Sequence, residues 1–168
     1  FDQNDAFEDA FVLDWYKFEL KGTCGVKSRP VGISIGGRKK APIKSLLCSR
    51  EVLNIEDMGS ELIKVGDKKF NNIRTHLDWS LGNDKIECPK DSYVKGIAQN
   101  GRNIKGILCA FTSPNSLGTK CVERGDYKAI QSIGDWQVGY NKISCEKNEY
   151  MAGVATKKGN PISILCCN

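Results

Sequence analysis

The sequence contains almost none of the residues on which metal sites usually depend. It has one histidine, His76, and none of its eight cysteines forms a C-x-x-C pair. Zinc sites in proteins use histidine and closely spaced cysteine ligands, so zinc has almost no ligand signature here. We therefore expect no metal and no cofactor.

Long hydrophobic runs are also absent. No apolar run approaches the ~20 residues of a membrane-spanning helix, and no signal peptide is visible. Because the chain begins with Phe1 instead of methionine, we expect a processed or trimmed form. Hydrophobic residues make up 40% of the chain and charged residues 27%, which predicts a soluble single domain over 1–168 with a buried core.

Recognisable catalytic patterns are missing as well. There is no G-x-S-x-G motif, and the "THLD" stretch that holds His76 has no counterpart in the related segments described below. The acidic clusters "CEKNE" (145–149) and "NIEDMGSE" (54–61) carry no sign of burial, so we interpret them as solvated loops. The sequence predicts a protein that is not an enzyme.

The net charge of +5 is too weak to indicate nucleic-acid binding, although it allows attraction to acidic glycans or membrane surfaces. The cysteines are more informative. An even number of them without metal-ligand spacing indicates disulfides, which form in oxidising compartments. We therefore expect a secreted or extracellular protein.

One pattern occurs three times. The segments are "DWYKFELKGTC" (14–24), "DWSLGNDKIEC" (78–88) and "DWQVGYNKISC" (135–145), each with lysine six residues and cysteine nine residues after the tryptophan. A glycine follows each cysteine by eight residues, then Ile or Val, and each unit closes on "LLC" or "ILC". Identities at so many fixed offsets indicate a triplication, with repeats at about 12–60, 76–120 and 133–168.

Each repeat has the sequence pattern of β-strands. In "SYVKGIAQ" and "EYMAGVAT" apolar and other residues alternate, and "NIKGILC" and "PISILC" are short apolar runs bounded by turn residues. The tryptophan segment is a third candidate strand, and "ELIKVG" or "YKAIQSI" in the linkers could supply a fourth. A small sheet cannot cover its own apolar face, so three units turned inward predict an all-β fold with pseudo-threefold symmetry. The β-trefoil is the main competitor, although it usually has shorter units.

The pattern W-x8-C, G-[IV] and [IL]-L-C, three times over with a terminal Cys-Cys, resembles the vitelline membrane outer layer protein family. The resemblance covers about 12–168. It implies a β-prism of the first type, with three four-stranded sheets as walls around a pseudo-threefold axis, an architecture also found in jacalin-like lectins. It also implies extracellular placement and favours glycan or surface binding. It transfers no catalytic site, because no such motif can be mapped.

The repeat also narrows the disulfide pairing. One bridge within each unit leaves two cysteines, which should tie the C-terminal tail to the second linker. The predicted pairs are Cys24–Cys48, Cys88–Cys109, Cys145–Cys166 and Cys121–Cys167.

Trp15, Trp79 and Trp136 could stack on sugar rings, but a residue present in every unit is more simply explained as filling the shared core. The aspartate before each tryptophan is expected to cap a turn.

The loops before the closing strands vary between units and are basic. The windows 36–47, 99–108 and 156–165 contain no Asp or Glu. If the units are related by a threefold axis, the three loops emerge at the same end. Their eight cations are the candidate binding residues: Arg38, Lys39, Lys40, Lys44, Arg102, Lys105, Lys157 and Lys158. Ordinary solubilising lysines are the alternative interpretation.

Three functions stay open at this point. The first is a non-enzymatic binding module that recognises a glycan or cell-surface component, alone or as the targeting part of a toxin or host-interaction protein. The second is a structural coat protein of the egg outer-layer type. The third is a glycan-active enzyme or an enzyme inhibitor. Association with another protein or domain is compatible with each.

Overall fold

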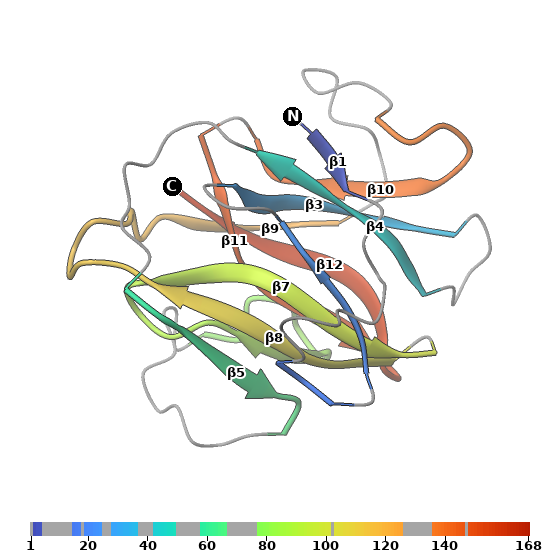
Figure 1. Cartoon of the computed structure of the whole chain (residues 1–168), viewed down its shortest axis with the longest axis horizontal. Coiled ribbons are helices and arrows are strands. Elements are labelled where there is room, and N and C mark those ends of the chain that lie inside the picture. Colours follow the sequence, from blue (N-terminus) through green and yellow to red (C-terminus); the bar gives the residue numbers. More distant parts are fainter. Residues whose placement is uncertain are drawn as a thin grey trace.

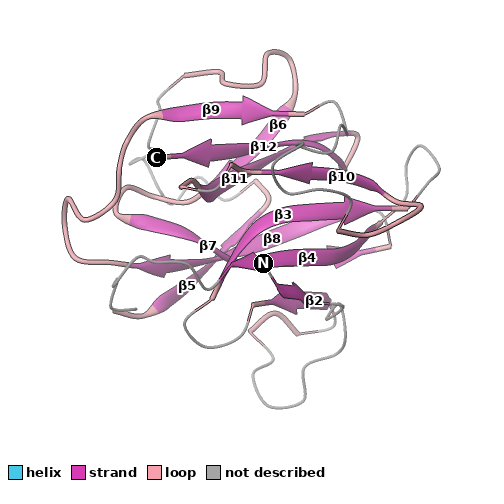
Figure 2. Ribbon diagram, turned by 90° about the horizontal axis from the view of Figure 1, so that it is seen from above, coloured by secondary structure: helices cyan, strands magenta, loops and turns pink. Residues whose placement is uncertain are grey.

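The computed structural model describes residues 2–4, 15–17, 19–24, 28–36, 42–49, 58–66, 77–101, 103–125, 136–146 and 148–168. Within these ranges the chain forms strands and loops without a helix (Figures 1 and 2). The strands are β1 (Asp2–Asn4), β2 (Leu20–Thr23), β3 (Arg29–Ile35), β4 (Ile43–Ser49), β5 (Ser60–Lys64), β6 (Asp84–Glu87), β7 (Ser92–Asn100), β8 (Asn103–Phe111), β9 (Cys121–Arg124), β10 (Asn141–Ser144), β11 (Tyr150–Lys157) and β12 (Asn160–Cys167).

These strands build three antiparallel four-stranded sheets, and each sheet borrows one strand from another repeat. The first sheet has the order β1-β4-β3-β10, the second β2-β7-β8-β5 and the third β6-β11-β12-β9. Counted together with the strand that precedes it in the chain (β1, β5 or β9), each repeat thus keeps three strands in one sheet and gives the strand after its tryptophan to the next sheet. The donation is cyclic, because β2 joins the second sheet, β6 the third and β10 the first.

A single large hydrophobic cluster contains side chains from all three sheets. The Ile or Val that follows the repeat glycine contributes one fully buried residue from each central strand: Ile33, Ile97 and Val154. The central strands β3, β7 and β11 contact one another. Because burial of one such side chain contributes about 1.5–3 kcal/mol, the aliphatic positions of the repeat supply the common core.

The repeat lysine holds the turn that follows each tryptophan. Its ammonium group donates to two backbone carbonyls, one and four residues after the tryptophan. Lys21 Nζ lies 3.0 Å from Tyr16 O, and Lys142 Nζ lies 2.7 Å from Gln137 O. Lys85 Nζ likewise bonds Ser80 O at 3.1 Å and Asn83 O at 2.6 Å. The three lysines therefore have the same structural role.

The tryptophans themselves lie in these turns, before the donated strands, and not within strands. The prediction that they fill the shared core needs correction, since all three are only partly buried. Trp15 lies against the face of β7 opposite Ile97, because its ring is 3.2 Å from a Cβ placed on Gly96. Trp136 contacts the edge of the core and donates from Nε1 to Ser144 Oγ at 3.1 Å. The described contacts of Trp15 and Trp136 thus place these rings on sheet surfaces and at the edge of the core.

The glycine that each repeat has eight residues after its first cysteine lies where the donated strand comes closest to the central strand of the sheet it joins. A Cβ on Gly32 would lie 2.9 Å from Ile143 O, one on Gly96 2.8 Å from Gly22 O, and one on Gly153 2.7 Å from Ile86 O. Each contact is to a carbonyl of the borrowed strand in the same sheet. A side chain at these positions would push the borrowed strand away from its sheet.

The four disulfides are the pairs that the repeat predicts: Cys24–Cys48, Cys88–Cys109, Cys145–Cys166 and Cys121–Cys167. The first three join two sheets each, because one cysteine directly follows a donated strand and its partner lies in the unit's own closing strand. Each pair lies within one repeat, as expected, and because the repeat shares its strands between two sheets, the three bridges also link the sheets in a ring. Cys121 and Cys167 are register partners on neighbouring strands of the third sheet.

The fourth strands were predicted in part. "ELIKVG" forms β5, as expected, and β5 pairs with β8. The stretch "YKAIQSI" lies outside the described residues, and the corresponding strand is β9, which begins earlier, at Cys121. In the first sheet the corresponding edge strand, next to the closing strand β4, is β1, and the sequence patterns did not indicate it.

We expect Lys142→Met to lower the free energy of unfolding by about 2 kcal/mol, because the carbonyls of Gln137 and Tyr140 would lose their donor. Lys157→Met is the control, since Lys157 is exposed, and should change stability by less than ~0.5 kcal/mol. Urea unfolding followed by tryptophan fluorescence measures both variants. Equal effects would contradict the assigned role of the lysine.

Removal of one inter-sheet disulfide, by Cys88→Ala with Cys109→Ala, should cost about 3 kcal/mol. Both cysteines are completely buried, whereas Cys121 is only partly buried. We therefore expect a smaller loss from Cys121→Ala with Cys167→Ala, although the sequence separation of that pair is 46 against 21. Guanidinium unfolding compares the two double variants, and the opposite order would show that loop length dominates.

Candidate functional site

The structure brings the described residues of the three predicted basic hairpins together at one end of the molecule, here named the hairpin end. Ile104, at the start of β8, donates its N–H to Gly159 O in the β11–β12 turn at 3.0 Å. Gln99, near the end of β7, bonds Ile43 at the start of β4 twice: Nε2 donates to Ile43 O at 2.7 Å, and Oε1 accepts from Ile43 N at 2.9 Å. These bonds connect all three hairpins.

The described cations of this end differ in exposure. Lys44, Lys157 and Lys158 are exposed, and Lys105 is partly buried. The remaining predicted site residues lie outside the described residues: Arg38, Lys39, Lys40 and Arg102.

Local geometry explains why the third hairpin presents its lysines to solvent. Lys158 and Gly159 both have positive φ, 51° and 82°, as the turn between two tightly connected antiparallel strands requires. Asn160 Nδ2 donates to the carbonyls of Lys157 and Lys158 at 3.3 Å each. The turn is therefore held by backbone and amide groups, and the ammonium groups take no part in it.

One further cation that lies at the hairpin end was not among the residues predicted from the sequence. Lys64, at the end of β5, is the register partner of Gly106 and lies with its Nζ 5.2 Å from the centre of the Tyr16 ring. It belongs to the "ELIKVG" stretch, so the predicted strand could have indicated it. The neighbouring donated strand also brings an acid, because Asp84 pairs in register with Thr156. A second acid, Glu19, directly precedes β2, whose Leu20 pairs in register with Gln99. The hairpin end is thus rich in lysine but mixed in sign where the donated strands β2 and β6 begin.

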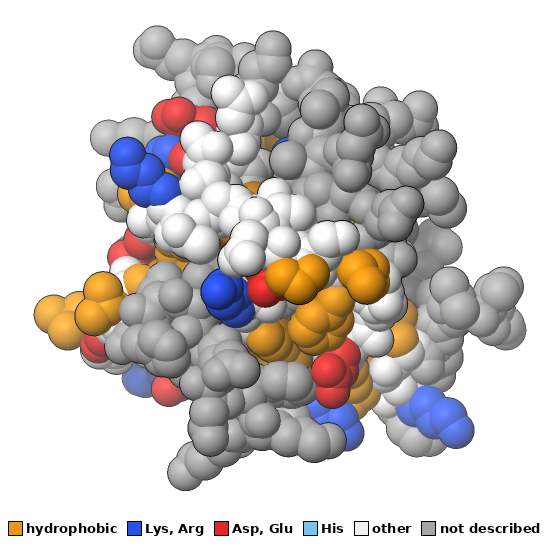
Figure 3. Space-filling view, turned by 90° about the vertical axis from the view of Figure 1, so that its left-hand side faces the viewer, with side chains coloured by type: hydrophobic (Ala, Val, Ile, Leu, Met, Phe, Trp, Pro, Cys, Tyr) orange, Lys and Arg blue, Asp and Glu red, His pale blue; other side chains and the backbone are white. Residues whose placement is uncertain are grey.

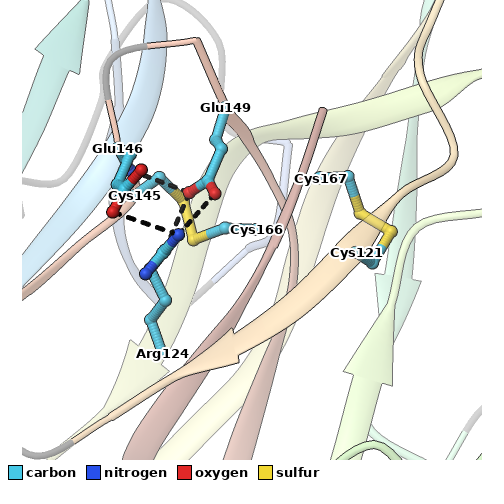
Figure 4. Close-up of a disulfide and its surroundings, with 7 residues drawn as sticks. All are labelled: Cys121, Arg124, Cys145, Glu146, Glu149, Cys166 and Cys167. Carbon is cyan, nitrogen blue, oxygen red and sulfur yellow. Dashed lines mark hydrogen bonds and ion pairs between the residues drawn. A yellow bond between two sulfur atoms is a disulfide. The ribbon is translucent and has the colours of Figure 1, made fainter.

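Near the start of β11 lies a second charged cluster (Figure 4). Arg124 Nε and Nη2 donate to the two carboxylate oxygens of Glu149 at 2.8 and 2.6 Å, and Glu149 Oε2 also accepts from the N–H of Glu146 at 2.8 Å. Burial raises the pKa of Glu149, but these hydrogen bonds and the charge of Arg124 outweigh it and hold the pKa below 4.5. The same pairing raises the pKa of Arg124.

This cluster corrects the interpretation of "CEKNE" as a solvated loop, because Glu149 is buried, although Glu146 is exposed. Glu149 also lies beside Cys145 and Cys166 (Figure 4). Both sulfur atoms are bonded to each other, so they offer no thiolate to a metal ion. We interpret the cluster as structural.

The acid of the "THLD" stretch also has a structural role. Asp78 accepts hydrogen bonds from Lys85 Nζ and from the N–H of Gly82, and the bond with Lys85 holds its pKa below the ordinary value. This matches the expected turn cap. His76 and the other two repeat aspartates, Asp14 and Asp135, lie outside the described residues.

Glu149→Gln should lower the free energy of unfolding at pH 7 by roughly 2 kcal/mol, because the partly exposed Arg124 loses its charged partner. Since the folded-state pKa of Glu149 is depressed, the stability that the carboxylate adds is complete above about pH 5 and is lost as the pH falls through that pKa. The difference from the parent should therefore shrink towards pH 3. Urea midpoints at both pH values test this, with the exposed Glu61→Gln as control, and a difference independent of pH would contradict it.

No protein-family model, no curated protein and no solved structure matches this chain. Among the described residues, none lies in a helix long and apolar enough to cross a membrane. The candidate site therefore stands on the geometry of the hairpin end alone.

Proposed function

We propose that this chain is a secreted, non-enzymatic binding module that recognises anionic glycans or a surface carrying them through the hairpin end. We further propose that its three sheets form a β-prism of the first type, related to the vitelline membrane outer layer family. The triplicated sequence, the three four-stranded sheets and the cyclic exchange of strands support this architecture. The four disulfides are consistent with an extracellular location.

The observation that carries the binding proposal is the contrast between two sets of lysines. Lys21, Lys85 and Lys142 are bonded to backbone carbonyls. Within the described part of the chain, the ammonium groups of the hairpin-end lysines make neither an ion pair nor a hydrogen bond: Lys44, Lys105, Lys157 and Lys158. Their charges are not needed by the fold and are available to a partner.

The distribution of these charges favours a partner with several anionic groups. Single exposed ion pairs contribute only ~0.2–1 kcal/mol, so one lysine cannot hold one acidic group firmly. Lysines from three different hairpins on one end can contact successive charges of a polymer, and their weak contributions then add through multivalency. Sulfated or sialylated glycans have this form, and their binding should weaken with salt.

The structural coat protein is the second candidate, and a specific observation favours it. Three disulfides link the three sheets in a ring, which suits a protein exposed to proteases and harsh conditions. A coat role depends on stability and self-association, not on a free cationic end. The two candidates therefore differ in what neutralising the hairpin end should do.

Reversal of two exposed charges, Lys44→Glu with Lys157→Glu, should weaken retention on heparin on the order of tenfold in affinity, because two attractions are replaced by two repulsions. The matched control is Lys90→Glu with Lys120→Glu, which removes two exposed lysines outside the hairpins. Both variants have the same net charge. Elution is measured along a salt gradient, with circular dichroism to check folding.

The hairpin-end variant should elute at a clearly lower salt concentration than the control variant. Equal shifts in both variants would show that only net charge matters and would reject the hairpin end as the site. Unchanged retention in both would remove support for anionic glycans and favour the coat protein.

A further inference from the structure

Arg29 is a buried cation that makes no ion pair within the described part of the chain. It is the first residue of β3, and only 7% of its surface is exposed. Its Nε is buried and, in the part of the chain that the structure describes, has no hydrogen-bond partner. A guanidinium group keeps its proton at any physiological pH, so this charge persists.

In the other two units, tyrosines occupy the position that is equivalent to Arg29. Arg29, Tyr93 and Tyr150 each follow the first cysteine of their unit by five residues. Each lies at the beginning of a central strand, and these strands, β3, β7 and β11, contact one another. The three side chains therefore come together at the end of the molecule opposite the hairpins.

Electrostatics supports this proximity. Burial lowers the pKa of Arg29, whereas the phenol oxygens of Tyr93 and Tyr150 raise it. The Tyr150 ring also packs in a cluster with Leu117 and Leu165, and Tyr93 packs against that cluster. Both tyrosines are thus close enough to Arg29 to affect its charge, and the Tyr150 hydroxyl donates to Gly118 O.

Among the residues that the structure describes, no carboxylate forms an ion pair with Arg29. Glu149, adjacent to Tyr150, is held by Arg124 through both of its oxygens. The Asp91 carboxylate, near Tyr93 in the chain, accepts from the N–H of Asn115 at 2.9 Å. An uncompensated buried charge costs several kcal/mol, so the guanidinium has a strong preference for an anion.

We propose that Arg29, flanked by Tyr93 and Tyr150, binds one oxyanion group, of the sulfate, phosphate or carboxylate type. The donors of a guanidinium group match two oxygens of such an anion at once. This site is separate from the hairpin end and holds a single group instead of a polymer.

The face on which the strands of this site begin is partly apolar. β3 and β7 begin on the left-hand side of Figure 1, which Figure 3 shows face on. Hydrophobic side chains gather near the middle of this face and, separately, at one edge, with charged side chains between and beside them (Figure 3). Met58, 64% exposed, belongs to this side, because its N–H bonds Phe111 O at the end of β8. Apolar surroundings lower the local dielectric and strengthen a pair between one cation and one anion.

The test is a titration of the isotope-labelled full chain with sodium sulfate at constant ionic strength, followed by NMR of the Arg29 Nε–H. Parallel titrations with inorganic phosphate and with acetate identify the preferred oxyanion. We expect a saturable shift of the Arg29 signal with at least one of the three, and none with chloride. Thermal unfolding in the same solutions should show a saturable rise in Tm for the parent.

Two variants separate this site from general salt effects. Arg29→Gln should lose the saturable rise in Tm, whereas Lys90→Gln, which removes one exposed charge, should keep it. If Arg29→Gln does not fold, Arg29→Lys replaces it and should bind more weakly, because an ammonium group lacks the two-oxygen match. The hairpin variant Lys44→Glu with Lys157→Glu should keep the Arg29 shift, so the two proposals can fail separately.

Absence of a saturable Arg29 shift with all three oxyanions would overturn the proposal. An equal rise in Tm for the parent and Arg29→Gln would also overturn it, because it would assign the effect of sulfate to general exclusion from the protein surface.

Discussion

The exchange of one strand between successive repeats is the constraint on which the rest of this structure depends. β2, β6 and β10 each complete a sheet that belongs to another unit. The repeat glycines allow that strand to come close, and the repeat lysines hold the turn that leads into it. The disulfide of each unit then fixes the donated strand to the unit from which it came. The residues shared by all three units are therefore mainly those that make the exchange work.

Much of the architecture follows from the repeat because fixed offsets reflect fixed geometry. Cysteines at equal offsets in every unit can pair equivalently, which gave the correct disulfides, and the G-[IV] step marks a buried position on each central strand. The destination of the donated strand could not be predicted, since an offset within a unit contains no information about which sheet receives it. A repeated tryptophan likewise indicates a structural role without indicating which face of the sheet it covers.

The residues of the two proposed sites are less predictable because they lie where the units differ. The basic hairpins could be found from composition, and the structure brings their described residues together. Arg29 gave no such signal: only alignment of the units beyond the cysteine reveals an arginine where the others have Tyr93 and Tyr150. Its burial depends on packing between strands of different sheets, which no single segment shows. The burial of Glu149 inside an acidic stretch was hidden in the same way, because Arg124 lies in a distant strand.

The cyclic exchange also bears on how such a chain can arise. A single unit of four strands would present an unpaired strand and an incomplete sheet, so it could not satisfy its backbone hydrogen bonds alone. Three separate copies of that unit could make every pairing seen between β2, β6, β10 and their host sheets, as in domain-swapped assemblies. The pairing scheme is that of a homotrimer whose subunits have been joined end to end. In a single chain each copy can vary independently, and Arg29 is one place where a position equivalent by the repeat carries a different chemistry from Tyr93 and Tyr150.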